Sequence, residues 1–275
     1  MSSTDHALVA AAGATRQGLL AGLRSWIILP IILAGAFMIT LDFFIVNVAI
    51  PSMQRDLHGG AASVQFVVAG YGLAYAAPLL IGGRLGDLYG RRRMFALGVG
   101  LFTLASGACG LAPTMAVLTA TRVLQGLAAL LGPQVLAILG VTFTGESRAR
   151  AFTAYGLTLG LAAVFGQLLG GLLIEANLAG LGWRSCFLIN LPIGAAALAL
   201  TPRLVPESRA PGRPRLDILG MILVTLALLA TVLPLIEGRE QGWPTWTWLC
   251  LITAMPLFLA FAAYQRRLGA RGGAP

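Results

Sequence analysis

Two charged residues stand inside apolar stretches of this sequence, and both could carry chemistry. Asp42 lies nine residues before Pro51, and Arg122 lies nine residues after Pro113. If each proline marks the outer end of a helix or of the turn beside it, a rise of 1.5 Å per residue places both charges about 13 Å below the outer surface of a membrane. The two side chains could therefore meet.

The chemistry that this pair suggests is proton transfer. An apolar surrounding favours the protonated form of a carboxyl group, so Asp42 is a candidate proton carrier. We hypothesise that Arg122 keeps Asp42 ionised while they are paired, and that Asp42 takes up a proton when substrate or a helix movement separates them. Two structural alternatives stay open: a static hydrogen bond that holds Asp42 to a neighbouring helix, and an Arg122 that only bonds helix carbonyls.

The stretches that must position these charges are long enough to be membrane-spanning helices. Of the 275 residues, 57% are hydrophobic and 11% are charged, which is typical of a membrane protein. A hydrocarbon core about 30 Å thick needs roughly 20 apolar residues in a helix. Eight stretches meet or approach this length: 26–50, 63–83, 94–111, 116–140, 151–174, 184–202, 217–236 and 246–264. We therefore expect an all-α integral membrane fold.

The basic residues indicate how these helices are oriented. All nineteen are arginine, and the formal net charge is +9. With a cytoplasmic N-terminus, fifteen arginines lie in cytoplasmic segments and three lie outside, as the positive-inside rule requires. The arginines separate apolar runs and do not line one face, so they do not indicate a nucleic-acid partner. Arginine-only basicity with abundant alanine and glycine is typical of GC-rich bacterial genomes, so we predict a multi-pass protein of the bacterial inner membrane.

The pattern divides the chain into five parts. They are a cytoplasmic N-terminal tail (1–25), a six-helix domain (26–202), a cytoplasmic linker (203–216), two additional helices (217–264) and a cytoplasmic tail (265–275). Four prolines and four arginines between 201 and 215 predict a stiff, extended linker. We expect residues 268–275 to be disordered.

A glycine- and arginine-rich stretch joins the second and third expected helices. It reads Gly82-Gly83-Arg84-Leu85-Gly86-Asp87-Leu88-Tyr89-Gly90-Arg91-Arg92-Arg93, and we expect it to form a turn. An aspartate among arginines indicates a latch that can be made and broken, although a cluster that only sets topology is the alternative. The stretch resembles the G-x-L-a-D-r-x-G-r-[RK]-[RK] signature of the major facilitator superfamily. The resemblance implies a conformational gate at Gly83, Gly86, Asp87, Gly90, Arg91 and Arg92.

Two further stretches resemble signatures of the fourteen-helix drug:proton antiporter subfamily. The residues from Leu41 to Pro51 are similar to its first-helix signature L-D-x-T-[IV]-V-N-V-A-[LI]-P, with Phe44 in place of the threonine. The residues from Arg122 to Gly126 are similar to R-x-x-Q-G, which the family associates with proton coupling. The resemblance thus implies a proton-coupling role for Asp42 and Arg122.

The fifth expected helix resembles the antiporter signature G-x8-G-x3-G-P-x2-G-G only at its end. Gly166, Gly170 and Gly171 match, whereas Gln167 stands where the signature has proline. Simple helix packing explains these glycines as well as antiport does. The sixth helix, from Trp183 to Gly194, and the linker tripeptide Pro206-Glu207-Ser208 also resemble the subfamily.

Taken together, the resemblance implies the N-terminal half of a major facilitator fold, with two inverted three-helix repeats, plus two further helices. It implies proton-coupled efflux of small, amphipathic or cationic drug-like compounds, driven by the proton gradient without a cofactor. The sequence shows no catalytic constellation or nucleotide-binding loop, and no metal-ligand spacing, so we do not expect an enzyme. A drug cavity needs apolar and aromatic walls. Candidate lining residues are Phe37, Phe43, Phe44, Gln65 and Tyr71.

Only one six-helix half is present, whereas transport in this family rocks two halves about a central site. Three interpretations stay open. The chain is a truncated transporter, which we favour, or a split transporter whose other half comes from a second chain or copy, or a nontransporting subunit that binds or regulates a full-length relative.

Overall fold

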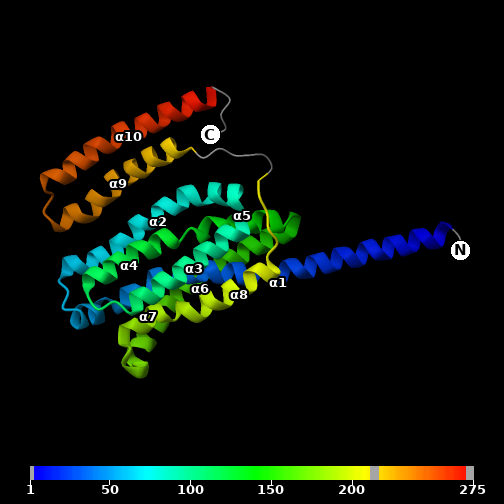
Figure 1. The fold of residues 1–275 in the computed structure, drawn as a ribbon, viewed down its shortest axis with the longest axis horizontal. Coiled ribbons are helices and arrows are strands. Elements are labelled where there is room, and N and C mark those ends of the chain that lie inside the picture. Colours follow the sequence, from blue (N-terminus) through cyan, green and yellow to red (C-terminus); the bar gives the residue numbers. More distant parts are fainter. Residues whose placement is uncertain (1–2, 211–216, 271–275) are drawn as a thin grey trace.

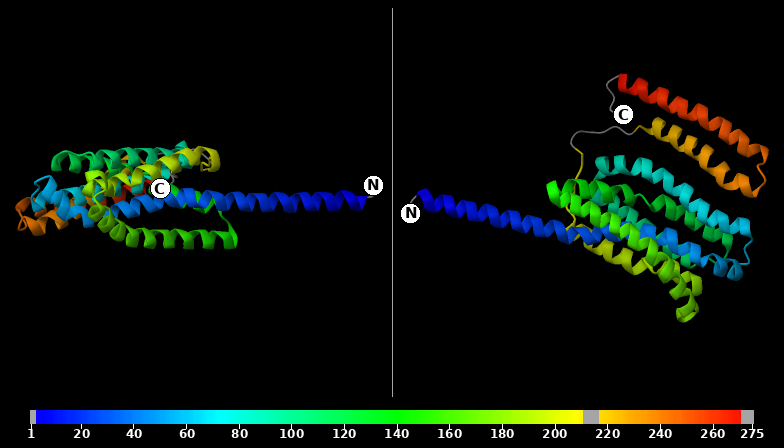
Figure 2. Two further views of the ribbon diagram at one scale, coloured as in Figure 1. Left: turned by 90° about the horizontal axis from the view of Figure 1, so that it is seen from below. Right: turned by 180° about the vertical axis from the view of Figure 1, so that it is seen from behind.

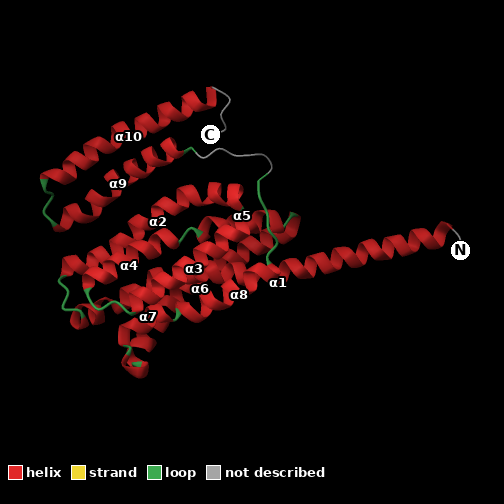
Figure 3. Ribbon diagram, in the orientation of Figure 1, coloured by secondary structure: helices red, strands yellow, loops and turns green. Residues whose placement is uncertain are grey.

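The computed structural model describes residues 3–210 and 217–270, and within these ranges it contains helices and loops but no strand (Figures 1 and 3). The long helices lie alongside one another, and the N-terminal part of α1 projects well beyond the others (Figure 2). The helices are α1 (Ser3–Asp56), α2 (Ala61–Tyr89), α3 (Arg91–Gly110), α4 (Met115–Ala128), α5 (Leu131–Thr142), α6 (Gly145–Ala176), α7 (Ser185–Leu188), α8 (Asn190–Leu204), α9 (Ile218–Glu240) and α10 (Thr245–Ala270), with short 3₁₀ turns at Leu178–Gly180 and Gly182–Arg184.

All eight expected spans lie mainly in helices. Six helical segments of the described chain are long and apolar enough to cross a membrane, and the two arms of a bent α2 make a seventh if they are counted as one span. The apolar segment Leu219–Leu235 of α9 is shorter than these six segments. The prediction of an all-helical membrane fold is confirmed.

Side chains and backbone at the helix ends explain where several helices start and stop. The Thr114 side chain accepts a hydrogen bond from the Val117 N–H (3.3 Å) at the start of α4. Asp217 likewise accepts from the Gly220 N–H (2.8 Å) at the start of α9. These caps satisfy N–H groups that have no partner within the first turn of a helix. A residue after the end of a helix can play a similar part. The helix α6 ends before Asn177, whose φ of 40° lies in the left-handed region.

The stretch 116–140, expected as one helix, is interrupted. The helix α4 ends at Ala128, and α5 begins at Leu131. Pro133 has no backbone N–H to donate, and it falls in the first turn of α5, where an N–H would have no partner within the helix. The interruption therefore falls where the proline can be tolerated.

The expected turn over residues 82–93 is mostly helical, which corrects that prediction. The helix α2 continues to Tyr89, α3 starts at Arg91, and only Gly90 lies between them. Gly90 has a φ of 106°, which favours glycine. The bend near the middle of α2 measures 50° between Ser63–Ala76 and Ile81–Tyr89. The sequence has Pro78 in this interval, and a proline removes one helical hydrogen bond.

The expected tails and linker also differ from their predicted boundaries. The helix α1 begins at Ser3, so the predicted N-terminal tail is helical from that residue onward. At its other end α1 continues past Pro51 to Asp56. The helix α8 extends to Leu204, so the linker begins at Val205. Residues 211–216 of the linker and 271–275 of the C-terminal tail lie outside the described residues, while 268–270 are helical.

Two clusters of buried apolar side chains form the core, one toward each end of the bundle. One includes Ile32, Phe95 and Leu131, and the other includes Ile45, Val67 and Phe187. The hairpin of α9 and α10 lies at the edge of the bundle, where α9 packs against α2 (Figure 1). The six-helix part therefore encloses the interior charges, and the hairpin flanks it.

Candidate functional site

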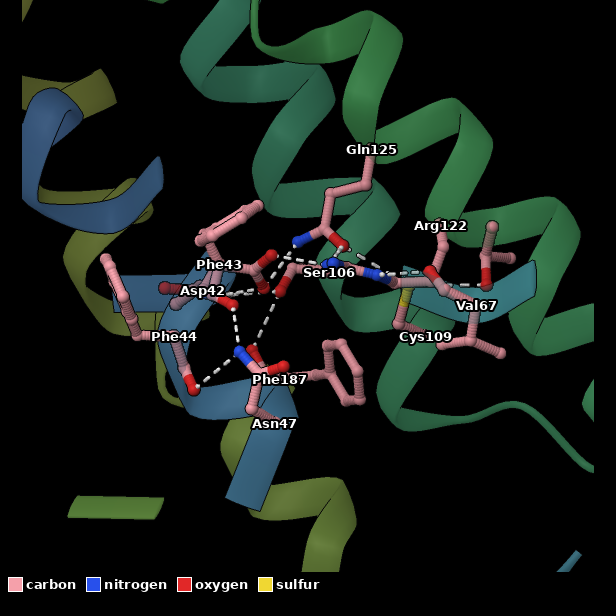
Figure 4. Close-up of polar contacts among 12 residues, drawn as sticks. Asp42, Phe43, Phe44, Asn47, Val67, Ser106, Cys109, Arg122, Gln125 and Phe187 are labelled. Carbon is pink, nitrogen blue, oxygen red and sulfur yellow. Dashed lines mark hydrogen bonds and ion pairs between the residues drawn. The ribbon is translucent and has the colours of Figure 1, made fainter. Parts of the chain in front are cut away.

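Asp42 of α1 and Arg122 of α4 form an ion pair in the interior of the bundle (Figure 4). Arg122 Nη1 donates a hydrogen bond to Asp42 Oδ2. The side chain of Asp42 is 0% exposed and that of Arg122 is 1% exposed. The structure thus confirms that the two residues meet, as their similar depth predicted. Their role in proton coupling stays a prediction.

Polar side chains from α3, α4 and α8 complete the surroundings of Asp42. Gln125 Nε2 donates to Asp42 Oδ1 (2.9 Å), and Asn190 Nδ2 of α8 donates to the same oxygen (3.2 Å). Asn190 Nδ2 also donates to Ser106 Oγ of α3 (3.0 Å), which in turn donates to the Phe187 carbonyl (2.9 Å). Both carboxylate oxygens therefore accept hydrogen bonds, which a buried charge requires. The network ties α1, α3, α4 and α8 together at one point.

Arg122 is held from a second side by α2. Arg122 Nε donates to the Val67 carbonyl (3.4 Å), and its guanidinium carbon lies 3.9 Å from the centroid of the Tyr71 ring. A further hydrogen bond runs from Arg122 Nη1 to Gln125 Oε1 (2.8 Å). The expected alternative, a bond to a helix carbonyl, thus coexists with the pair to Asp42. Arg122 therefore links α4 to both α1 and α2.

Glycine lets α4 approach α2 closely beside this pair. A Cβ atom at Gly126 would lie 2.5 Å from the Tyr71 carbonyl oxygen and 2.8 Å from the Ala74 Cβ. Since real Cβ atoms do not approach so closely, only glycine fits here. The signature R-x-x-Q-G therefore has a local reason for each of its three named residues: the ion pair, the amide beside it, and the close packing of two helices.

An aromatic cavity of about 260 Å³ lies next to the ion pair. Its lining residues are Ile39, Thr40, Phe43, Phe44, Tyr71 and Tyr75. Three of the five predicted lining residues are thus brought together, while Phe37 and Gln65 are not among the lining residues of this cavity. Ile39, Thr40 and Tyr75 were missed, because a single sequence does not show which face of α1 or α2 is turned inward.

The predicted latch contains a short ion pair inside its own segment. Arg91 Nη2 lies 2.7 Å from Asp87 Oδ1, four residues apart across Gly90. A Cβ atom at Gly86 would collide with the Gln134 side chain of α5, whereas one at Gly83 would meet nothing within 4 Å. Gly86 therefore serves helix packing in this structure, and Gly83 contacts no other element closely.

Glu207 of the linker also belongs to this latch, although the sequence did not single it out as a site residue. Its Oε1 accepts from the Arg92 N–H (3.1 Å), and its Oε2 lies 3.7 Å from Arg92 Nε and 3.7 Å from Arg93 Nε. The Ser208 carbonyl accepts from the Arg91 N–H (3.0 Å). The linker thus caps the N-terminus of α3, where free N–H groups and the helix dipole favour an anion.

Replacing Glu207 with alanine is expected to release the linker from α3. Because the carboxylate binds a backbone N–H and two arginines, its loss should speed tryptic cleavage after the exposed Arg209 roughly fivefold. The matched control is Glu146→Ala, which removes an exposed pair with Arg150 within one helix. Equal cleavage rates in the two variants would show that Glu207 does not hold the linker.

The antiporter-like glycines of α6 divide into two groups. A Cβ atom at Gly166 would lie 3.0 Å from the Leu41 carbonyl oxygen, and one at Gly170 would lie 3.0 Å from Ile45 Cγ1. These two glycines therefore let α6 pack against α1 next to Asp42. Gly171 meets nothing within 4 Å, and Gln167 is exposed. Helix packing accounts for the first two residues, and the role of Gly171 and Gln167 stays a prediction.

No group of three or more histidine, cysteine, aspartate or glutamate side chains that could hold a metal occurs in the described residues. The buried polar residues that sequence reasoning did not name as sites include Ser106, Gln125, Gln134 and Asn190, all 0% exposed. Each of them interrupts an apolar stretch. That interruption is a usable signal, because a polar group buried in a membrane span needs a partner.

Comparison with known proteins bears on this arrangement. Residues 32–272 match the family model described as Major Facilitator Superfamily. The chain is 45% identical over 252 residues to a probable actinorhodin transporter of Streptomyces coelicolor, which covers 91% of this chain and 44% of that protein. It is 43% identical over 251 residues to the puromycin resistance protein pur8 of Streptomyces alboniger, with 89% and 48% covered.

Solved structures show the same fold at low sequence identity. The transporter PepTSo, of the POT family, aligns with a TM-score of 0.60 at 16% identity, over 90% of this chain and 55% of that chain. The human organic anion transporter MFSD10 aligns with a TM-score of 0.57 at 16% identity, over 76% and 56%. The chain therefore spans about half the length of the curated relatives and of the solved structures that it matches.

Proposed function

The chain belongs to the Major Facilitator Superfamily, and from this premise we propose that it acts in proton-coupled efflux of small, drug-like compounds. One observation carries the proposal: a buried Asp42–Arg122 pair lies directly beside an aromatic cavity. A carboxyl group that alternates between a paired, ionised form and a separated, protonated form can exchange protons across a membrane. The aromatic cavity offers the apolar surface that amphipathic or cationic compounds need.

The proposed cycle has two states of the pair. In one state Arg122 neutralises Asp42, and Gln125 and Asn190 hold the carboxylate in place. In the other state a proton replaces Arg122 as the partner of the carboxyl group. Moving between them requires α4 to shift against α1, since these helices carry the two charges. No cofactor enters this cycle, and the proton gradient supplies the energy.

The proposed orientation places the N-terminus in the cytoplasm of a bacterial cell, with the protein in the inner membrane. The arginine distribution of the sequence supports this orientation. The latch of Asp87, Arg91 and Glu207 and the linker then lie on the cytoplasmic side. There they can hold the cytoplasmic ends of α2, α3 and α8 together in one state of the cycle.

We further propose that a second six-helix half completes the transport path. The chain covers 44% of the probable actinorhodin transporter that it resembles. The helix α6 exposes a row of large apolar side chains: Leu157, Leu161, Val164, Leu168 and Leu172. Such a surface suits contact with another set of helices or with lipid. Three sources would supply this second half: a longer form of this chain, a separate chain or a second copy.

Ethidium transport into inverted membrane vesicles tests this function. Vesicles that contain the full chain are expected to accumulate ethidium when their lumen is made acidic, and to lose it when nigericin collapses the pH gradient. ATP without a gradient should drive no uptake. Accumulation that persists without the gradient would contradict proton coupling. An inserted chain that moves no ethidium, but changes the efflux rate of a co-expressed relative, would favour the alternative of a regulatory subunit.

A further inference from the structure

Tyr71 belongs both to the aromatic cavity and to the surroundings of the ion pair. It lines the cavity with Phe43 and Tyr75, and its ring covers the guanidinium of Arg122 at 3.9 Å. The ring is parallel to that of Tyr75, with centroids 6.1 Å apart and an angle of 3° between the planes. The side chain of Tyr71 is therefore the wall between the space for a substrate and the charges that handle the proton.

In the position where the Tyr71 ring covers Arg122, the Tyr71 hydroxyl lacks a hydrogen-bond partner among the described residues. Tyr71 is 1% exposed, and this hydroxyl is buried. A buried hydroxyl without a partner is costly. Rotation of the ring into the cavity would bring the hydroxyl to water, at the expense of the contact with Arg122. Two opposing terms therefore act on this side chain.

The backbone of Tyr71 is fixed while its side chain has room. Gly126 of α4 packs against the Tyr71 carbonyl, and the Val67 carbonyl, one turn earlier on α2, accepts from Arg122. The cavity of about 260 Å³ in front of the ring is the space into which the side chain can turn. A compound in that cavity would occupy the same space and keep Tyr71 against Arg122.

We propose that Tyr71 is a lid that makes occupation of the aromatic cavity and protonation of Asp42 mutually exclusive. This inference rests on the proposed function. When the cavity is empty, Tyr71 turns into it, Arg122 loses its aromatic contact, and a proton reaches Asp42. When substrate fills the cavity, the lid stays closed and the Asp42–Arg122 pair stays intact. Mutual exclusion of proton and substrate is the condition for exchange of one against the other.

This geometry predicts how a bound substrate affects the Asp42–Arg122 pair. The sequence hypothesis allowed substrate itself to separate the pair, whereas the position of Tyr71 between cavity and pair implies that substrate keeps the pair closed. The titratable side chains around Asp42 are Arg122 of α4, Tyr71 of α2, Cys109 of α3 and Cys186 of α7. Since phenols and thiols are neutral near pH 7, binding of substrate should release the proton from Asp42 itself.

The test counts protons released per ethidium bound, in weakly buffered detergent solution with a pH-indicator dye. The wild-type chain should release protons as ethidium binds, and Asp42→Asn should bind ethidium without release. Tyr71→Leu, which removes the aromatic cover, should bind ethidium but release roughly tenfold fewer protons per molecule bound. If Tyr71→Leu releases as many protons per ethidium bound as the wild-type chain does, the proposal is overturned.

Two companion variants separate the lid from general effects on the cavity. Tyr71→Phe keeps the aromatic cover of Arg122 but loses the hydroxyl that favours the open position, so it should fold, bind ethidium and release fewer protons per molecule bound than the wild-type chain. Wild-type release in Tyr71→Phe would contradict the role of the hydroxyl in opening the lid. Tyr75→Leu, in the same cavity, should weaken ethidium binding but leave the release per molecule bound unchanged. If the wild-type chain shows neither proton release nor gradient-driven uptake, the proposed function itself has failed. If the wild-type chain shows proton release and driven uptake, and Tyr71→Leu releases as many protons per ethidium bound, only the proposal that Tyr71 is a lid is wrong.

Discussion

Replacing Arg122 with alanine is expected to destabilise the folded chain by roughly 3–5 kcal/mol, because it leaves the Asp42 carboxylate buried without a counter-charge. Asp42→Asn should also be destabilising, because it leaves the Arg122 guanidinium, which keeps its proton, buried without a counter-charge, although the asparagine carbonyl can still accept a hydrogen bond from it. The double variant Asp42→Asn with Arg122→Gln removes both charges and keeps polar groups at both positions. It should therefore be more stable than Arg122→Ala, although it cannot couple transport to protons.

Thermal unfolding in detergent of Asp42→Asn, Arg122→Gln and the double variant, followed together with gradient-driven ethidium uptake, checks this expectation. The pattern that supports the account is non-additive stability, with the double variant partly recovered, and no recovery of transport. If the free-energy losses of the two sites simply add, the two side chains do not act as a pair. If the double variant still takes up ethidium when the pH gradient is imposed, neither charge is needed for coupling.

Gly126→Ala is expected to have the second-largest effect, from a single added methyl group. Its Cβ would lie 2.5 Å from the Tyr71 carbonyl oxygen and 3.1 Å from the Tyr75 N atom, so α2 and α4 must move apart. Overpacking of this kind costs about 1–3 kcal/mol. It should also weaken transport, since it displaces Tyr71 and Arg122, which meet across this contact.

The matched control is Gly156→Ala on α6, where an added Cβ meets nothing within 4 Å. In a helix interior, alanine is more favourable than glycine by about 0.5–1 kcal/mol, so the two substitutions should shift the unfolding midpoint in opposite directions. A Gly126→Ala variant as stable as the Gly156→Ala variant would show that the close approach of α2 and α4 does not constrain the site.

The main features of the fold follow from the sequence because a membrane constrains them strongly. Length and hydropathy predict the spans, and the equal depth of Asp42 and Arg122 predicts that they meet. The interruption between α4 and α5 was missed, although Gly132-Pro133 in the middle of an apolar stretch is the local signal for it. Hydropathy is insensitive to such a break, because both sides of it are apolar.

The parts of the site that the sequence did not predict depend on contacts between distant segments. Glu207 lies 115 residues from Arg92, and Asn190 lies 148 residues from Asp42. Nothing local to either residue shows its partner. The facing of aromatic side chains is similarly a tertiary property: Phe43 lines the cavity and Phe37, six residues earlier on the same helix, does not. The helix period alone does not say which face is turned inward.

The most direct test of the account compares two kinds of ethidium movement in vesicles that contain Asp42→Asn, with insertion checked at the wild-type level. One is uptake driven by an acidic lumen, and the other is exchange of internal for external ethidium without a gradient. If Asp42 carries the proton and the cavity binds the compound, the variant should lose driven uptake and keep exchange. Driven uptake at the wild-type rate would contradict the central claim that Asp42, paired with Arg122, couples transport to protons.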